Sequence, residues 1–471
     1  MHCKFRFPLI VFILLLSFAS GFRASAQEED LQNPYKSALP GIGADKIAVY
    51  IEDLRSGEVL LDVNGEEPMV PASVTKVVTA ATLVHKKGMD DRYLSKVIAA
   101  GKIDKDGVLN GNIIVKACGD PTIESAYFTE YKGIADSITC AAKRMGIKKI
   151  KGGVIIDCPR WLCEPIPSGW SKEDVNYPYG ADHHAANFAD NRFVLTYKSD
   201  GNYSVSPKTP DVGFKAVSGK SGVSRNPGDT NYTVGHRGRK PLSATLANPL
   251  PESSLRYAIE SKLTDADIEI GGEKIESPKH NVEIYCHKSP IAADILKSLI
   301  VRSDNVMAEA MLRFAWPGIS RSAAAKNELN LWKDLGVNMN DVTLEDGSGL
   351  SRKNRLTAYA LADLLVWMRE KEPEFGRFLN MFPRAGQTGT LRSFLKGTQL
   401  EGRLWAKTGS MSGVQSYAGY VVGDDGKPTH VVVVMVNGFK CDRAKLKAGI
   451  SRMLLDTLFP APTENSEEMF D

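Results

Sequence analysis

The sequence predicts an α+β fold whose antiparallel sheet is built from both ends of the chain. Residues 46–64 alternate between apolar and polar positions and read as two strands joined at residues 55–57. Residues 403–439 read as three more strands, with a turn at residues 423–426 between the last two. Helical periodicity lies between these regions, and a further helix is expected over residues 443–458. The two ends therefore form one domain, which the middle of the chain interrupts.

The first 26 residues have the pattern of a secretory signal peptide. His2, Lys4 and Arg6 precede an apolar core over residues 8–19, and Ala-Ser-Ala at residues 24–26 forms a small-residue cleavage site. The apolar core is too short to span a bilayer as a stable anchor. We therefore expect an exported chain that starts near residue 27 and has no integral membrane segment after cleavage.

Composition excludes several kinds of partner. The formal net charge of the 471 residues is only +3, and no basic stripe with interleaved aromatics occurs, so nucleic acid is not an expected partner. No second apolar run reaches membrane-spanning length, and the tail after residue 463 is acidic, the wrong sign for a membrane-binding foot. We expect a soluble protein.

Six of the seven cysteines follow the signal peptide. Their spacing contains no C-x-x-C and gives no indication of zinc, so we expect neither a metal nor a cofactor. Cys140, Cys158 and Cys163 are close enough in sequence to pair, and export permits disulfides. A core of this size does not need them, so the pairing stays open.

The segment most informative about function covers residues 71–84, where Pro-Ala-Ser-Val-Thr-Lys leads into an apolar helical run. This pattern places Ser73 and Lys76 in the first turn of a buried helix, on one face because they are three positions apart. A neutral amine there can take the proton of the hydroxyl, and the free N–H groups of a helix start can hold an oxyanion. This is the geometry of a serine nucleophile for acyl transfer.

A Ser-x-x-Lys pattern alone is a weak signal, because it arises by chance and occurs again at Ser393. Two further boxes distinguish the first copy: Ser-Asp-Asn at residues 303–305 and Lys-Thr-Gly at residues 407–409. In the second copy, Ser393 precedes the Lys-Thr-Gly box by only 14 positions, and the Ser-Asp-Asn box comes earlier in the chain than Ser393, so the boxes are not in the required order. Ser73 is therefore the predicted nucleophile.

Between the first and second boxes lie 230 positions, and this stretch reads as an insertion. A helix is expected over residues 134–145 and an apolar strand over residues 153–157. Residues 200–251 are rich in Gly, Ser, Pro, Asn and Thr with short alternating strands, which indicates an all-β module. Residues 289–314 return to helical periodicity.

The order of the three boxes is that of penicillin-binding proteins and class A β-lactamases. Further motifs accompany them: Gly-Asp-Pro-Thr at residues 119–122, Asp-Gly-Ser-Gly-Leu-Ser-Arg at residues 346–352, and Ala-Gly-x-x-Gly-Thr-Leu at residues 385–391. With these motifs, nearly the whole mature chain resembles the class C low-molecular-mass penicillin-binding proteins. These form the D-alanyl-D-alanine carboxypeptidase/endopeptidase family, in which a long insertion follows the first box.

The resemblance implies a β-lactamase/transpeptidase-like domain, antiparallel sheet plus helices, made of residues 27–96 and 287–471. Two inserted, largely β-containing domains, one nested in the other, interrupt it over residues 97–286. The resemblance also implies a periplasmic serine peptidase, soluble or loosely associated with the wall. Such an enzyme cleaves D-Ala–D-Ala or D-Ala–diaminopimelate bonds in peptidoglycan peptides and is inhibited covalently by β-lactam antibiotics.

The residues of the three boxes can be assigned chemical roles in acyl transfer. Ser73 attacks the carbonyl carbon of the penultimate D-Ala, and Lys76 is the base, with its pKa lowered by burial and by a second cation, Lys407. Ser303 relays a proton between the leaving nitrogen and Lys407, while Asn305 orients Lys76 or holds the substrate amide.

The strand of the third box is expected to bind substrate. Lys407 and Thr408 suit the terminal carboxylate, and Gly409 and Ser410 continue the same binding strand. The family's motif positions imply an oxyanion hole formed by the backbone N–H groups of Ser73 and Ser410.

A further set of residues is expected to recognise the substrate's side chain. Asp157, which ends an apolar strand, and Trp161 resemble the family's acidic and aromatic pair beside the active-site mouth. The carboxylate of Asp157 can pair with a diaminopimelate ammonium, while Arg352 takes the neighbouring carboxylate. An Asp that caps a strand-to-loop turn, and an Arg that forms a surface ion pair, are the alternatives.

Two other interpretations of function stay open, a serine β-lactamase and a catalytically silent wall-binding module. Glu328, the candidate for a deacylating glutamate, falls in a segment that reads as an ordinary helix, residues 322–335. Asp182-His183-His184 looks like a metal cluster, but no carboxylate–His spacing completes a site, so exposed loop histidines are expected. Residues 346–349 are expected to form only a tight loop.

Overall fold

The computed structural model describes residue 39 and residues 41–164, 166–198, 200–218, 222–236, 240–275 and 280–460. The predicted signal peptide and the acidic end of the chain lie outside these residues. Among the described helices, none combines the length and the apolar character needed to cross a bilayer.

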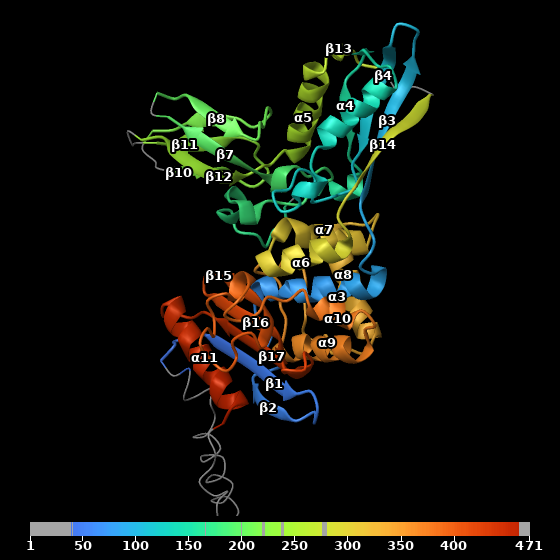
Figure 1. The fold of residues 1–471 in the computed structure, drawn as a ribbon. Helices are drawn as coiled ribbons and strands as arrows, with labels where there is room; N and C mark the ends of the chain where they lie inside the picture. The colour runs from blue at the N-terminus through green and yellow to red at the C-terminus, as the bar shows by residue number, and fades with distance from the viewer. Residues whose placement is uncertain are drawn as a thin grey trace, which may run out of the picture.

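The central five-stranded sheet is antiparallel and joins the two ends of the chain, as predicted (Figure 1). Its strand order is β15-β16-β17-β1-β2, so the strand that begins the fold pairs with the strand that nearly ends it. The strands are β1 (Lys46–Asp53), β2 (Val59–Val63), β15 (Leu404–Met411), β16 (Val414–Val422) and β17 (Pro428–Asn437).

Both faces of this sheet are buried, which explains the near-continuous valines of β17. Val431, Val433 and Met435 point into the core under the helices, whereas Val432 and Val434 point into the core under α11 (Arg443–Leu458). Because side chains alternate along a strand, a sheet covered on both sides needs apolar residues at every position.

α11 covers one face of the sheet. Helices that lie between β2 and β15 in the sequence cover the opposite face (Figure 1). They surround α3, whose residues from Thr75 to Val84 are all buried. The helices of this layer are α3 (Thr75–Lys87), α6 (Ala292–Arg302), α7 (Asn305–Ala315), α8 (Arg321–Asp334), α9 (Ala358–Lys371) and α10 (Phe375–Leu379).

The chain leaves this layer at β3 (Leu94–Ile103) and returns at β14 (Asn281–Lys288), and the two strands pair antiparallel. They belong to a second sheet, with order β13-β5-β4-β3-β14 and with β6 on β4. The remaining elements of this part are β4 (Val108–Lys116), α4 (Ile134–Arg144), β5 (Lys149–Ile150), β6 (Val154–Asp157), α5 (Pro251–Asp265) and β13 (Glu269–Ile270).

A small β module lies within the insertion, on the opposite side from β3 and β4 in Figure 1. Its two three-stranded sheets enclose a core around Phe193, Tyr232 and Leu246. The strands are β7 (Arg192–Tyr197), β8 (Tyr203–Ser206), β9 (Phe214–Ala216), β10 (Gly222–Ser224), β11 (Tyr232–Gly235) and β12 (Leu242–Ala247).

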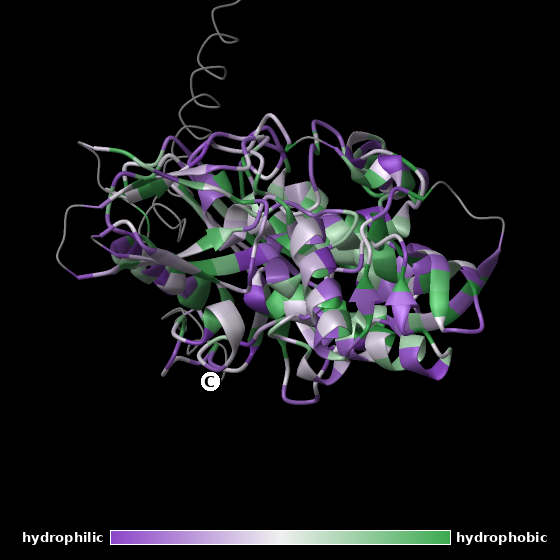
Figure 2. Ribbon diagram, turned by 90° about the horizontal axis from the view of Figure 1, so that it is seen from above, coloured by the Kyte–Doolittle hydropathy of each residue, from purple (hydrophilic) through white to green (hydrophobic). Residues whose placement is uncertain are grey.

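The α+β class is confirmed, and so are the N-terminal hairpin, the three C-terminal strands and the last helix. Figure 2 shows apolar segments in helices and strands and mostly polar loops at the periphery. Of the described cysteines, all six that follow the predicted signal peptide are free, including Cys140, Cys158 and Cys163.

Candidate active site

Ser73 lies at the junction of the sheet and the helical layer. It belongs to a short 3-10 turn, η1 (Ala72–Val74), directly before α3, and not to the first α-helical turn as predicted. Ala72 has a left-handed backbone with φ 51°, which costs a non-glycine residue about 1–3 kcal/mol. Such strain is typical of nucleophiles held at a fixed angle, and the tight turn presents Ser73 half-exposed above buried neighbours.

Lys76 is fully buried beneath Ser73, and three oxygens surround its amine. Its Nζ lies 3.0 Å from Oγ of Ser73, 2.6 Å from Oδ1 of Asn305 and 2.5 Å from the carbonyl oxygen of Ser348. The amide of Asn305 also donates to the carbonyl of Tyr179, at 2.5 Å. Asn305 thus holds Lys76, which favours orientation of the lysine over binding of a substrate amide.

Ser303 and Lys407 form a second serine–lysine pair. Nζ of Lys407 lies 2.9 Å from Oγ of Ser303 and 2.6 Å from the carbonyl of Thr408. Ser303 ends α6 with a left-handed backbone, φ 63°, and Asp304 caps α7 by accepting from the N–H of Met307. The break between α6 and α7 therefore turns Ser303 toward β15.

Both buried lysines are poised to be neutral. Burial lowers the pKa of Lys76 to about 8, although the negative charges of Asp346, Asp304 and Glu309 oppose the shift. Burial, and then the charge of Lys76, hold the pKa of Lys407 well below its ordinary value. The sequence predicted that burial and the charge of Lys407 together lower the pKa of Lys76. Burial does lower it, whereas Lys407 is not among the causes, and it is the pKa of Lys407 that the charge of the other lysine lowers.

Acylation of Ser73 should accelerate as pH rises through about 8. Only a neutral amine accepts a proton, so below this pKa the rate should fall about tenfold per pH unit. The check is the second-order rate of labelling by fluorescent penicillin between about pH 6 and pH 10. A rate that stays flat across this range contradicts a lysine base with this pKa.

The loop over residues 346–349 does more than the tight turn expected from sequence, because its backbone contacts the buried amine of Lys76. The N–H of Ser348 donates to Glu309 at 2.8 Å while its carbonyl accepts from Lys76. Gly349 has φ 78°, and a Cβ there would lie 2.0 Å from the carbonyl oxygen of Ala72. The glycine thus lets the loop pass close enough to reach the amine.

Gly409 allows β15 to pass beside the nucleophile. A Cβ at this position would lie 2.6 Å from the carbonyl oxygen of Pro71 and 3.2 Å from the backbone nitrogen of Ser73. The glycine of the third box is therefore a close-approach residue, which lets β15 run beside the backbone of Ser73.

Replacing Gly409 by alanine should lower the acylation rate about 10- to 100-fold, because displacements of less than 1 Å are costly at a reacting centre. Because the atoms that the Cβ would meet belong mainly to the backbone and the position is buried, the Tm should also fall, so labelling is measured well below the Tm of the variant. The measurement pairs penicillin labelling with the Tm. Gly376→Ala is the matched control, since a Cβ there meets nothing within 4 Å. Acylation by the Gly409 variant at the wild-type rate contradicts this role.

Several residues of the site were not found from the sequence. Thr408 Oγ1 donates to Thr390 Oγ1 at 2.8 Å, and Thr390 belongs to the motif at residues 385–391, which was the available signal. Arg443 pins the end of β15 by donating to Oγ of Ser410, at 2.6 Å, and to the carbonyl of Met411. No sequence pattern indicates Arg443.

The structure does not bring Asp157 and Trp161 to the boxes. The carboxylate of Asp157 pairs with Lys116 at 2.6 Å, on the surface of the insertion. Trp161 packs partly buried in the insertion's core, and its carbonyl lies near Arg313, at the end of α7 away from Asn305. Their role in side-chain recognition stays a prediction. Arg352 is closer to the site, because it donates to the carbonyl of Ser412, just beyond β15.

The remaining candidates from the sequence, Asp182, His183 and Glu328, are buried in the interior. His183 is buried, not exposed as expected, with Nε2 2.6 Å from the carbonyl of Gly119, and Asp182 pairs with Arg321. Within the described part of the chain, no group of three or more metal-ligating side chains occurs. Glu328 is buried in α8 beside the hydroxyls of Thr82 and Thr79, farther along α3 than Lys76, and burial raises its pKa to about 8.

Comparisons with known proteins agree with this geometry. The model of the D-Ala-D-Ala carboxypeptidase 3 (S13) family matches residues 29–456. The chain is 25% identical over 456 residues to the D-alanyl-D-alanine carboxypeptidase DacB of Haemophilus influenzae, covering 91% of each chain. It is 27% identical over 476 residues to the D-alanyl-D-alanine carboxypeptidase of Actinomadura sp. (strain R39), covering 90% of this chain and 85% of that one.

The fold is also similar to a solved structure. Penicillin binding protein 4 (dacB) from Haemophilus influenzae superposes with a TM-score of 0.76 at 24% identity, covering 90% of this chain and 98% of that one. Together with the family match over most of the chain, this shows that the protein belongs to the D-Ala-D-Ala carboxypeptidase 3 (S13) family, the class C low-molecular-mass penicillin-binding proteins.

Proposed function

We propose that the protein is an exported serine DD-peptidase that cleaves D-Ala–D-Ala and D-Ala–diaminopimelate bonds of peptidoglycan through an acyl-enzyme on Ser73. The observation that carries this proposal is the 3.0 Å approach of the buried Lys76 amine to Oγ of Ser73. An amine shielded from water and partly neutral at physiological pH is a base for the hydroxyl.

Acylation proceeds by transfer of the Ser73 proton to Lys76 as Oγ bonds to the carbonyl carbon of the penultimate D-Ala. The resulting oxyanion is held by the backbone N–H groups of Ser73 and Ser410, an arrangement supported by the close approach at Gly409. The C–N bond then breaks, and the leaving nitrogen takes the proton of the Ser303 hydroxyl. The proton that Lys76 accepted from Ser73 replaces it, so Lys76 is neutral again for hydrolysis of the ester. Water completes the cycle by hydrolysing the ester.

The leaving group is recognised by its carboxylate. Lys407 and Thr408 lie in the middle of β15, where Lys407 contacts Ser303, and Thr390 holds the Thr408 hydroxyl in place. A carboxylate beside the buried Lys407 amine raises the pKa of that amine and favours its protonated form, so the contact becomes charge-assisted and contributes about 1.5–3 kcal/mol. Penicillin presents a carboxylate and a reactive carbonyl together, so it should acylate Ser73 and remain bound as an ester.

The test is mass spectrometry of the products released from purified peptidoglycan, together with the mass of the intact protein after exposure to benzylpenicillin. Loss of D-Ala from pentapeptides and a stable penicilloyl adduct support the proposal. Rapid turnover of nitrocefin without a stable adduct indicates a β-lactamase instead. The absence of both labelling and product indicates a wall-binding module.

A further inference from the structure

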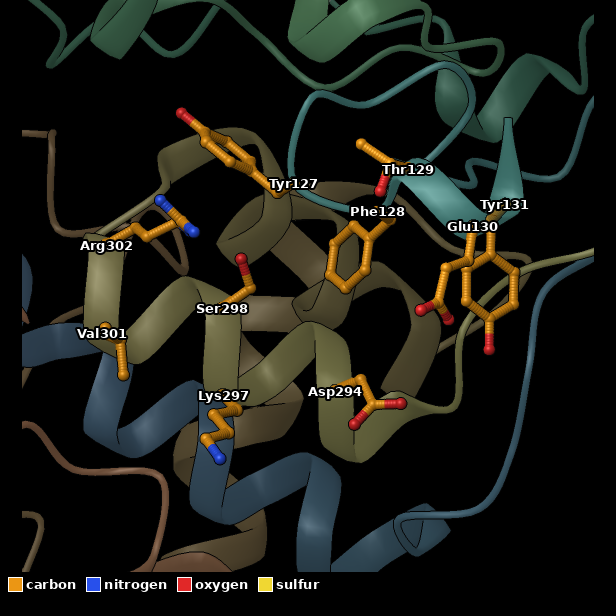
Figure 3. A pocket seen from close by; sticks show the side chains of 10 residues that line it. All are labelled: Tyr127, Phe128, Thr129, Glu130, Tyr131, Asp294, Lys297, Ser298, Val301 and Arg302. Carbon is orange, nitrogen blue, oxygen red and sulfur yellow. The ribbon is translucent and has the colours of Figure 1, made fainter. Parts of the chain in front are cut away.

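A groove continues beyond the carboxylate site on the leaving-group side. It has a volume of about 730 Å³ and starts at Thr408 and Ser410. Tyr127, Val301 and Arg302 line this groove and also a second cavity of about 480 Å³ along α6, so the two hollows adjoin at a common wall. Figure 3 shows the residues that line the second cavity.

The insertion and the catalytic part build this path together. Figure 3 shows side chains of residues 127–131, from the insertion, facing side chains of α6. The guanidinium of Arg302 lies 4.2 Å from the centre of the Tyr127 ring, which fixes the ring at the junction of the two cavities. The insertion thus supplies one wall at the place where the two cavities meet.

All charged side chains that line the groove at Thr408 are positive. Arg302, Arg392 and Lys447 line it, and no acidic side chain does. Within the described residues, none of the three forms an ion pair, and the two arginines are exposed. Guanidinium and ammonium groups that line one groove and have no carboxylate in an ion pair favour a ligand with carboxylates.

We propose that this groove binds the second stem peptide of a crosslinked substrate, with Arg392 and Lys447 on its free carboxylates. The inference rests on the proposed DD-peptidase function. In a D-Ala–diaminopimelate crosslink, the leaving amine belongs to the second stem, and the carboxylate beside that amine takes the place of the D-Ala carboxylate at Thr408. The rest of the stem then continues past Thr408, where the cationic groove lies.

The experiment compares two purified substrates, a monomeric pentapeptide and a crosslinked dimer. For Arg392→Gln combined with Lys447→Gln, kcat/KM for the dimer should fall about 10- to 100-fold, the factor expected when charge-assisted contacts are lost. Pentapeptide trimming should change less than about twofold. Raising the salt concentration should weaken dimer cleavage by the wild type more than by the variant.

Two controls sharpen the comparison. Arg384→Gln removes a cation that stacks on Trp405, 4.0 Å from the ring centre and outside the groove lining, and should not alter the ratio of the two rates. A dimer in which all second-stem carboxylates except the one beside the leaving amine are amidated should be cleaved slowly by the wild type and no more slowly by the double variant.

An equal loss on both substrates, or an equal effect of Arg384→Gln, overturns the inference. Wild-type protein that trims pentapeptides but leaves dimers intact also overturns it, while the carboxypeptidase function stands. Failure to process either substrate instead contradicts the proposed function itself, so the two failures are distinguishable.

Discussion

Replacing Ser73 by alanine should abolish covalent labelling by penicillin, because its hydroxyl lies 3.0 Å from the buried Lys76 amine and beside the close-packed β15 strand. Ser303, the other serine beside a buried lysine, is assigned to proton relay and should not replace it. Labelling is read from the mass of the intact protein after exposure to fluorescent or unlabelled benzylpenicillin. The variant should remain folded, since the serine side chain is half-exposed and the turn is held by its backbone.

Ser393→Ala is the matched control and should label normally. It removes the second Ser-x-x-Lys serine, which lies exposed at the groove, and its companion Lys396 is exposed as well. Lys396 has none of the burial that makes Lys76 a candidate base. Loss of label in the Ser393 variant, with label retained after Ser73→Ala, would place the nucleophile elsewhere.

Replacing Lys76 by arginine should be nearly as damaging as replacing it by alanine. A guanidinium does not give up its proton in a protein, so the variant keeps the positive charge and loses the base. Removing a general base costs roughly 10²–10⁴ in rate. The measurement is the second-order acylation rate with benzylpenicillin.

Lys86→Arg, on the exposed end of the same helix, controls for the general effect of the exchange and should leave acylation unchanged. A Lys76→Arg variant that is acylated within a few-fold of the wild type rules out Lys76 as the base. The outcome separates proton transfer from simple electrostatic attraction, because only the former needs a neutral nitrogen.

Much of the fold and the centre of the site follow from local sequence. The strands of the central sheet alternate or run continuously apolar, as sheets with buried faces require, and turns mark their ends. The serines and lysines of the boxes are predictable because acyl transfer needs those side chains at fixed spacing. Their meeting in space, Lys76 with Asn305 and Lys407 with Ser303, agrees with this expectation.

What the sequence did not indicate depends on contacts between distant segments. The carbonyl of Ser348 and the carbonyl of Tyr179 take part as backbone groups, which any residue supplies, so their positions leave no trace in residue type. The burial of His183 and Asp182 follows from packing against Arg321 on α8, more than a hundred positions away. The wall at Tyr127 likewise forms only when the insertion folds against α6.

The pairing of β1 with β17 also determines when, during folding, the site around Ser73 is assembled. Ile51 pairs with Val432, so the central sheet closes only after nearly the whole chain has been made. Joining segments so far apart in sequence is slow, because loop closure loses entropy before the contacts form. The insertion's sheet is more local and can form first. Until the last strands arrive, Ser73 lacks both Lys407 and the N–H of Ser410, so a nascent or truncated chain carries the nucleophile but stays chemically inert toward peptides and antibiotics alike.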